Sequence, residues 1–244
     1  MEELYNVIFS KDKVVVITGA GISTLSGIPD FRGNQGFYTK GSNVEYYLSL
    51  ECLREEPEVF YEFYKNNLIV ENIEPNIVHK TLALLEERGL ITGIITQNID
   101  GLHTRAGSKN VIELHGNGDR YYCCTCKSNY KEQDYKESCI CNNCGGLIRP
   151  DVVLYGESVR TNRYQDALKM VEECDKIVVL GSTLSVSTIQ GIINKFIATK
   201  DNFSIDDIII VNRGETDYDK VSTRFDVDLG EMFTKILKKS NLDK

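Results

Sequence analysis

Short apolar runs recur along the chain, and their pattern predicts buried strands that alternate with helices. Runs rich in valine and isoleucine predict strands at residues 14–18, 91–96, 152–154, 176–181 and 207–212. The stretches between and around them predict helices at residues 1–12, 79–89, 163–174, 188–199 and 231–239. Strands of this kind, separated by helices, are typical of a parallel sheet that helices cover on both sides. The pattern therefore predicts a doubly wound α/β fold.

One stretch, residues 34–78, departs from this alternation because it is rich in aromatic side chains. Phe60 and Tyr64 lie about one helical turn apart, and Leu68 follows one turn further on. This spacing favours helices that pack against one another. We interpret residues 34–78 as a helical insertion with an aromatic core.

Composition narrows the class of protein. At 244 residues, the chain is long enough for one large domain or for one and a half. Its formal net charge of −8 argues against direct nucleic-acid binding by phosphate neutralisation, and is compatible with a basic peptide as partner. No apolar run approaches the length of a membrane span, and the first residues do not resemble a signal peptide. We therefore expect a cytoplasmic protein that does not contact a membrane.

The first predicted strand leads directly into Gly19-Ala20-Gly21. A strand that runs into Gly-x-Gly commonly brings backbone amides and a helix N-terminus against a phosphate group. Thr24 stands near the place where a dehydrogenase fingerprint has its third glycine, and no ribose-binding acid follows a second strand at the usual distance. Instead, residues 29–33 place a carboxylate, an aromatic ring and a guanidinium in one stretch. This composition suits a loop that folds over a cofactor, and a charged surface turn is the alternative.

Small and amide-bearing residues follow four of the predicted strands. Because the carboxyl ends of parallel strands meet at one edge of the sheet, these residues should converge there. They are residues 19–24, 96–100, 181–183 and 212–213. Their convergence predicts a nucleotide-binding site at this edge.

Six of the eight cysteines lie in one region, at positions 123, 124, 126, 139, 141 and 144. Such clustering without a secretion signal favours a metal site over disulfides. Cys123-x-x-Cys126 and Cys141-x-x-Cys144 are separated by 14 residues (127–140), close to the spacing of a four-cysteine zinc site. Four thiolates leave no open coordination position, so we expect one structural zinc ion. Cys139-x-Cys141 is a competing pair, and free or redox-active cysteines are the alternative.

His115 is one of three histidines, and it follows the apolar run 111–114 directly before Gly116. Taken alone, a histidine in this position is more often structural. Beside a ribose-binding edge it is also a candidate general base, because the pKa of imidazole lies near working pH. We expect structural roles for His79 and His103.

Several motifs together resemble one family, the sirtuins, which are NAD-dependent protein deacylases. They are, in chain order, Gly19-Ala20-Gly21-Ile22-Ser23, residues 27–32, residues 96–100, His115-Gly116, the four cysteines and Tyr155-Gly156-Glu157. The resemblance covers nearly the whole chain, and its length is similar to that of the compact bacterial or archaeal members. It implies a Rossmann-like large domain (residues 1–33, 79–117 and 151–244). It also implies a small domain made of the helical module 34–78 and a zinc ribbon at 118–150.

The resemblance also implies roles for individual residues. NAD, which the reaction consumes, would be bound by Ala20, Thr24, Phe31, Arg32, Gln97, Ile99, Asp100, His115, Ser182, Thr183, Asn212 and Val227. The catalytic residues would be His115, Asn98 and Asp100, with His115 accepting a proton from the ribose and Asp100 holding the carboxamide. Ser182-Thr183 reverses the order of the family's Thr-Ser. An acetylated-lysine peptide would pair as an added strand between residues 153–157 and 182–186, contacting Val152, Val153 and Tyr155.

The expected reaction is deacetylation of protein lysine, with release of nicotinamide and 2′-O-acetyl-ADP-ribose. Sirtuins that remove succinyl groups carry Tyr-x-x-Arg in the helical module, whereas this chain has Tyr61-x-x-Tyr64. We therefore expect acetyl, or a longer neutral acyl group, to be preferred over succinyl. Mono-ADP-ribosyl transfer from the same NAD site, or a non-catalytic module that binds NAD or ADP-ribose, are the alternatives. The sequence identifies neither the substrate proteins nor the oligomeric state.

Overall fold

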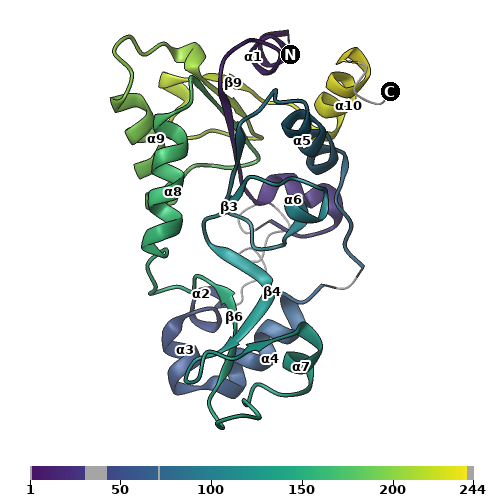
Figure 1. Ribbon diagram of the computed structural model, residues 1–244, viewed down its shortest axis with the longest axis vertical. Helices are drawn as coiled ribbons and strands as arrows, with labels where there is room; N and C mark the ends of the chain where they lie inside the picture. Colours follow the sequence, from purple (N-terminus) through teal and green to yellow (C-terminus); the bar gives the residue numbers. More distant parts are fainter. Residues whose placement is uncertain (1, 31–42, 71, 241–244) are drawn as a thin grey trace.

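The computed structural model describes residues 2–30, 43–70 and 72–240 of a chain that folds into two parts (Figure 1). The larger part contains a six-stranded sheet in the order β3-β2-β1-β7-β8-β9, in which every neighbouring pair is parallel. Its strands are β1 (Val14–Thr18), β2 (Gly93–Thr96), β3 (Val111–Glu113), β7 (Lys176–Leu180), β8 (Ile208–Val211) and β9 (Thr223–Phe225). From β1 the chain builds outward to β3 and then crosses to β7 on the other side of β1. This order confirms the predicted Rossmann-like sheet, with its topological switch point between β1 and β7.

Helices cover both faces of this sheet because successive side chains of each strand point to opposite sides. Val14 and Val16 pack with α1 (Glu2–Ile8), α5 (Ile77–Glu87) and α10 (Leu229–Ser240). Val15 and Ile17 pack with α8 (Thr161–Glu172) and α9 (Ser187–Ala198). None of the helices in the described part of the chain combines the length with the apolar character that a bilayer crossing requires.

The smaller part, at the bottom of Figure 1, has a three-stranded antiparallel sheet in the order β5-β4-β6. Its strands are β4 (Gly116–Cys123), β5 (Asn129–Tyr130) and β6 (Ile148–Val152). Its helices are α2 (Val44–Tyr47), α3 (Leu50–Glu55), α4 (Pro57–Asn67) and α7 (Glu132–Glu137). Helices and sheet share one aromatic core, in which the rings of Tyr61, Tyr64 and Tyr121 all contact Tyr135. The predicted helical module contains helices α2, α3 and α4 and the start of α5, and its residues 68–70 and 72–76 are not helical. Its residues 34–42 and 71 lie outside the described residues.

Short irregular elements complete the chain. The 3₁₀ segments are η1 (Ala20–Ser26), η3 (Ile205–Asp207) and η4 (Asp219–Val221), and α6 (Leu102–Arg105) is a single helical turn. The glycine-rich turn after β1 thus leads into a 3₁₀ segment. The predicted boundaries between the two domains remain a prediction, and β4 begins at Gly116, two residues before the proposed start of the zinc ribbon.

One predicted strand is wrong in its bounds and in its sheet. The apolar run at residues 152–154 was expected to be a strand of the alternating pattern, but β6 covers Ile148–Val152 and pairs with β4 in the antiparallel sheet. Most of β6 was not predicted because Arg149 and Asp151 are charged. Both are nevertheless buried there, paired with Glu157 and Arg163, which lie 8 and 12 residues further along the chain. Strand β4 was missed because it is polar, and β3, β5 and β9 were missed because they span only three, two and three residues.

A buried histidine pair joins α5 and α6 to the sheet. His79 Nδ1 accepts the amide of Asn76 at 3.4 Å, and His103 Nε2 lies 2.9 Å from Thr18 Oγ1. The two rings meet edge to face, with centroids 4.9 Å apart. Burial lowers the pKa of both imidazoles well below the usual 6.5. Both side chains are therefore neutral structural groups, as expected from the sequence.

We expect this pair to make the protein less stable in mild acid. Below a pH of about 6.5 the unfolded chain protonates both histidines, whereas the folded chain does not. The free energy of unfolding should therefore fall with decreasing pH by up to about 1.4 kcal/mol per pH unit for each histidine. Urea unfolding between about pH 7.5 and 5 measures this slope. Zinc content must be followed at each pH, since acid also releases thiolate-bound metal.

The matched variant is His103→Gln, which keeps a polar group beside Thr18 and does not titrate. Its slope should be lower than that of the parent protein by up to one proton. Equal slopes for the two proteins, at equal zinc content, would show that His103 does not carry the effect.

Candidate functional site

A large cavity of about 1860 Å³ lies at the carboxyl ends of the parallel strands, between the two parts of the molecule. Its wall contains most of the residues that the sequence singled out for cofactor and substrate. They are Ala20, Thr24, Gln97, Asn98, Ile99, His115, Val152, Val153, Tyr155, Ser182, Thr183, Asn212 and Val227. The structure therefore brings together at one site residues from the loops after β1, β2, β7, β8 and β9 and from the antiparallel sheet. Phe31 and Arg32 lie outside the described residues.

The floor of the cavity is formed where the turns after β1 and β7 meet. Gly181 has a left-handed backbone (φ +61°), and a Cβ at this position would lie 2.6 Å from the amide nitrogen of Ile22. Glycine is therefore required for the two turns to touch. Their contact brings Ala20 and Ser182 to the same edge of the sheet, where sequence reasoning predicted a nucleotide site.

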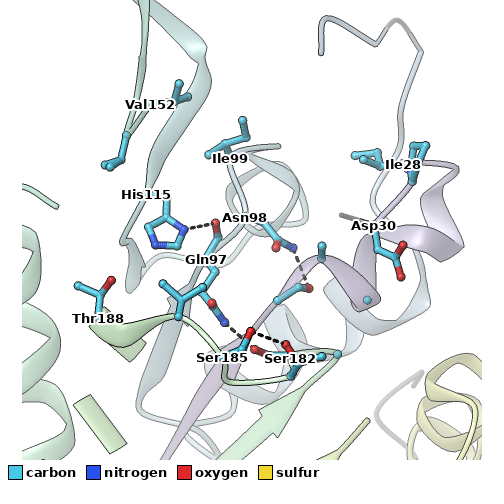
Figure 2. A pocket seen from close by; sticks show the side chains of 18 of the residues that line it. Ile28, Asp30, Gln97, Asn98, Ile99, His115, Val152, Ser182, Ser185 and Thr188 are labelled. Atoms are coloured by element: carbon cyan, nitrogen blue, oxygen red, sulfur yellow. Dashed lines mark hydrogen bonds between the residues drawn. The ribbon is translucent and has the colours of Figure 1, made fainter. Parts of the chain in front are cut away.

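Asn98 and Asp100 organise the segment η1 through a serine to which the sequence assigned no role. Ser23 donates to Asp100 Oδ2 at 2.6 Å and accepts Asn98 Nδ2 at 3.1 Å. Asn98 Nδ2 also donates to the carbonyl of Gly19 at 3.1 Å (Figure 2). The other oxygen of Asp100 accepts the amide of Leu102 at 2.9 Å. Asp100 is thus engaged behind the cavity wall and is absent from the described lining residues.

A second residue without an assigned role, Asn76, holds the other side of η1. Its Nδ2 donates to Ile22 O at 2.8 Å and to Ser26 Oγ at 2.9 Å. Its Oδ1 accepts the amide of Val78 and caps α5. An asparagine before an amphipathic helix is a readable cap signal. Its bonds to a segment about 50 residues earlier are not readable from the sequence.

Gln97 connects the loops that follow β2 and β7. Its Nε2 donates to Ser182 Oγ at 2.7 Å, and the same oxygen accepts the amide of Leu184 at 3.1 Å (Figure 2). Ser182 is buried, and its hydroxyl oxygen joins the two loops that form this part of the cavity wall. The residue at this position is a serine, and its small side chain permits this contact.

His115 is held in one tautomer by the backbone. Its Nδ1 lies 2.9 Å from the carbonyl oxygen of Gln97, which can only accept, so Nδ1 carries the hydrogen (Figure 2). The lone pair is therefore on Nε2. Burial lowers the pKa of His115, against the opposing effect of the Gln97 carbonyl. The imidazole is accordingly neutral near pH 7 and can accept a proton at Nε2.

The predicted substrate segment runs across the cavity directly beside His115. The amide of Val153 donates to His115 O at 2.8 Å, and Tyr155 exchanges backbone hydrogen bonds with Leu48 and Leu50. This segment therefore lies between the β3–β4 turn and the start of α3. The side chain of Tyr155 is exposed on the surface of the cavity.

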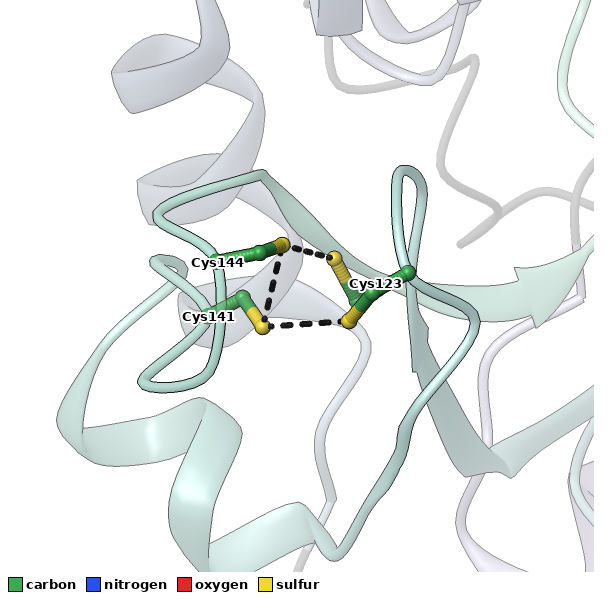
Figure 3. Close-up of side chains that lie close together, drawn as sticks. Cys123, Cys141 and Cys144 are labelled. Carbon is green, nitrogen blue, oxygen red and sulfur yellow. Dashed lines mark hydrogen bonds between the residues drawn. The ribbon is translucent and has the colours of Figure 1, made fainter.

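The four predicted cysteine ligands converge at one point (Figure 3). The Sγ atoms of Cys123, Cys126, Cys141 and Cys144 all lie within 4.8 Å of one another, with close pairs at 3.5 and 3.6 Å. Zinc–sulfur bonds of about 2.3 Å in a tetrahedron require sulfur–sulfur distances of about 3.8 Å. The cluster therefore fits one zinc ion with no open position. Cys124 and Cys139 are not part of it, which decides against the competing pair.

Tyr130 is a residue of the zinc site that the sequence did not reveal. Its hydroxyl donates to Cys141 Sγ at 2.9 Å, and the amide of Thr125 points at Cys123 Sγ at 3.4 Å. Such donors stabilise thiolate charge and orient the ligands. None of the four cysteines lines the cavity, so the zinc site is structural.

Comparisons with known proteins agree with this geometry. Residues 19–188 match the model of the Sir2 family. A protein of Staphylococcus aureus named NAD-dependent protein deacetylase is 42% identical over 229 residues, which is 91% of each chain. One of the same name from Staphylococcus epidermidis is 38% identical over 229 residues, covering 91% of this chain and 90% of the relative.

Solved structures of the same family also superimpose on this chain over nearly its whole length. A complex described as Sir2 with a p53 peptide and NAD⁺ superimposes with a TM-score of 0.88 at 35% identity, over 99% of both chains. A complex of Sir2 with an inhibitor, 2′-O-acetyl-ADP-ribose and a deacetylated p53 peptide has a TM-score of 0.86 at 34% identity. It covers 99% of this chain and all of the other.

We expect removal of zinc to destabilise the smaller part of the molecule, because Cys123 and Cys141 lie in its core. Cys126→Ser should lose the metal, and its melting temperature should fall by at least about 5 °C. Cys124→Ser, outside the cluster, is the control and should retain one zinc per chain. Metal analysis together with thermal unfolding measures both. A full equivalent of zinc in Cys126→Ser would contradict the assignment.

Proposed function

The chain belongs to the Sir2 family, and from this premise we propose that it is an NAD-dependent protein-lysine deacetylase. Its products would be free lysine, nicotinamide and 2′-O-acetyl-ADP-ribose. The observation that carries the proposal is the position of His115. It is a neutral imidazole at the wall of a cavity to which the ends of parallel strands contribute, and its Nδ1 is bonded to the Gln97 carbonyl, which leaves the lone pair on Nε2. The names of the deacetylases from Staphylococcus and the acetyl-ADP-ribose complex of a similar structure support the same reaction.

NAD would occupy the cavity as a substrate that is consumed. Its ribose carbon carries a good leaving group, nicotinamide. The acyl oxygen can bond to that carbon as nicotinamide leaves. The proposed cofactor contacts of this chain follow the strand ends: Ala20 and Thr24 after β1, Ser182 and Thr183 after β7, Asn212 after β8, and Val227 after β9. Gly19, Ala20 and Gly21 line the cavity, so this turn would lie against the phosphates. Phe31 and Arg32 remain proposed contacts from the sequence.

Residues of the β2 loop would surround the nicotinamide and its ribose. We assign this role to Gln97, Asn98 and Ile99, which line the cavity beside His115. Asp100 would act with them, and its bond to Ser23 supports a role in holding the loop in shape. His115 would take the proton of a ribose hydroxyl at Nε2 while Nδ1 stays bonded to Gln97. The resulting ribose oxygen can then attack the acyl carbon. Addition of one water molecule and departure of the lysine amine would leave the acetyl group as an ester on the ribose.

The acetylated-lysine peptide would lie along the segment beside His115. Val152 and Val153 line the cavity there, and Tyr155 is exposed at its surface. The peptide would add a strand between residues 153–157 and 182–186, so that its backbone provides affinity with little dependence on sequence. The division into two domains at the predicted boundaries is also a proposal that rests on the sequence. So are a cytoplasmic location and the absence of nucleic-acid contact.

The first test is mass spectrometry of the products formed from NAD and an acetylated peptide. The parent protein should form nicotinamide and acetyl-ADP-ribose, and His115→Tyr should reduce the rate by about 100-fold or more, since general base catalysis is worth that much. ADP-ribose attached to protein would instead support ADP-ribosyl transfer. If the parent protein bound NAD but formed no product, the result would support a non-catalytic module that binds NAD or ADP-ribose.

The second test concerns the acyl group. Tyr64 lines the cavity, while the hydroxyl of Tyr61 donates to Lys136 O outside it at 2.8 Å. Among the described lining residues Arg213 is the only cation, and its guanidinium is paired with Asp228 at 2.6 Å. A negatively charged acyl group would therefore be buried without a partner, at a cost of at least about tenfold in rate.

Accordingly, kcat/KM for acetyl-peptide should exceed that for succinyl-peptide by at least about tenfold. A butyryl-peptide is the control for size, because it is similar in length and uncharged. It should react faster than the succinyl-peptide. Faster removal of succinyl than of acetyl groups would overturn the preference.

A further inference from the structure

The segment beside His115 is closed by a buried ion pair that the reaction itself does not use. Arg149, in β6, and Glu157, eight residues later, form a bidentate contact of 2.7 Å (Nη1–Oε1) and 2.8 Å (Nη2–Oε2). The side chain of Arg149 is 6% exposed and that of Glu157 is 22% exposed. The ring of Tyr122 lies beside the guanidinium, whose carbon is 6.0 Å from the ring centroid. Arg149 is therefore buried, while Glu157 is largely buried and lies at the wall of the cavity.

Each partner also holds one backbone group of the residues between them. Arg149 Nη2 donates to the carbonyl of Val152 at 2.7 Å, and Glu157 Oε2 accepts the amide of Leu154 at 2.9 Å. Between these two bonds, Val153 donates its amide to His115 O at 2.8 Å. Three consecutive residues of the proposed peptide-binding segment are thus fixed, two of them by the ion pair and one by the backbone of His115.

The Arg149–Glu157 pair is better suited to fixing the orientation of neighbouring groups than to raising the stability of the fold. A buried ion pair contributes little net stability, because desolvation of both charges offsets their attraction. A bidentate guanidinium–carboxylate contact does restrict orientation strongly. Burial by itself would raise the pKa of Glu157, but the hydrogen bonds from Arg149 and the Leu154 amide lower it. The carboxylate is therefore charged, and able to accept both bonds, at neutral pH.

We propose that Arg149 and Glu157 are positioning residues for the acylated peptide, an inference that rests on the proposed deacetylase function. They hold Val152, Val153 and Leu154 in the extended shape against which the peptide backbone pairs. They contact none of the strand ends assigned to NAD. The pair therefore sets the affinity for peptide, while NAD binding and proton transfer at His115 stay as they are.

Glu157→Gln tests this with the smallest change, since the amide keeps the size of the side chain and loses the charge. The KM for acetylated peptide should rise by about tenfold or more, because hydrogen bonds to a charged group are lost. The KM for NAD and kcat should change by less than about twofold. Arg149→Lys should show the same split, because lysine cannot bond two carboxylate oxygens and Val152 O together.

Asp207→Asn is the matched control. Asp207 accepts Lys176 Nζ at 3.2 Å and the amide of Ser204 at 2.9 Å, so it also joins one cation and one backbone amide. It is the last residue of η3, directly before β8, at the opposite end of the strands from the cavity. Its kinetic constants should equal those of the parent protein, which separates positioning from a general loss of stability.

Direct binding gives a second measurement. The dissociation constant for a fluorescent acetylated peptide, measured by anisotropy, should rise in Glu157→Gln as much as the KM does. Because an unpaired buried Arg149 lowers stability, both constants are measured well below the melting temperature of the variant, at saturating zinc. An unchanged peptide KM, or an equal rise in the KM for NAD, in a folded variant would overturn the proposal. Absence of deacetylation in the parent protein would overturn the proposed function instead, and the two failures are thereby distinguished.

Discussion

The contact between the turns after β1 and β7 is the constraint on which the rest of the structure depends. Gly19 donates its amide to Leu180 O at 3.0 Å and Gly21 donates to Gly181 O at 2.9 Å, so backbone lies directly on backbone. A Cβ at Gly19 would lie 2.7 Å from Gly181 O, which leaves no room for a side chain. Because the turns touch, the residues that follow them form one continuous edge. The cavity, its polar wall and the position of η1 all follow from this contact.

The zinc site supports the cavity indirectly, through the β4–β6 sheet. Its four thiolates close the end of the β4–β6 sheet, and the aromatic core beneath them joins that sheet to α4 and α7. β6 then continues into the residues that run beside His115. A metal far from the chemistry can thereby determine whether the peptide-facing segment has its shape, while the Arg149–Glu157 pair determines that shape locally.

The sequence predicted those elements whose own residues form a continuous apolar run or a recognisable spacing. The valine and isoleucine runs of β1, β2, β7 and β8 are buried on both faces, and the paired Cys-x-x-Cys spacing selects four ligands among six clustered cysteines. The family motifs also indicated which residues would line one cavity. Ser23 and Asn76 went unassigned because their partners lie 77 and 54 residues away in the chain. Tyr130 went unassigned because the cysteine spacing does not reveal which neighbouring side chain donates to a ligand.

Periodicity, motif spacing and residue chemistry were enough to define a parallel sheet, a four-thiolate site and a histidine beside a nucleotide-binding edge. The tertiary structure alone decided the tautomer of His115, the engagement of Asp100 with Ser23, and the burial of Arg149 and Asp151 in β6. The physical reason is that periodicity reports the average environment of a side chain. The direction of a hydrogen bond and the burial of a charge depend instead on which distant atoms the fold places within about 3 Å.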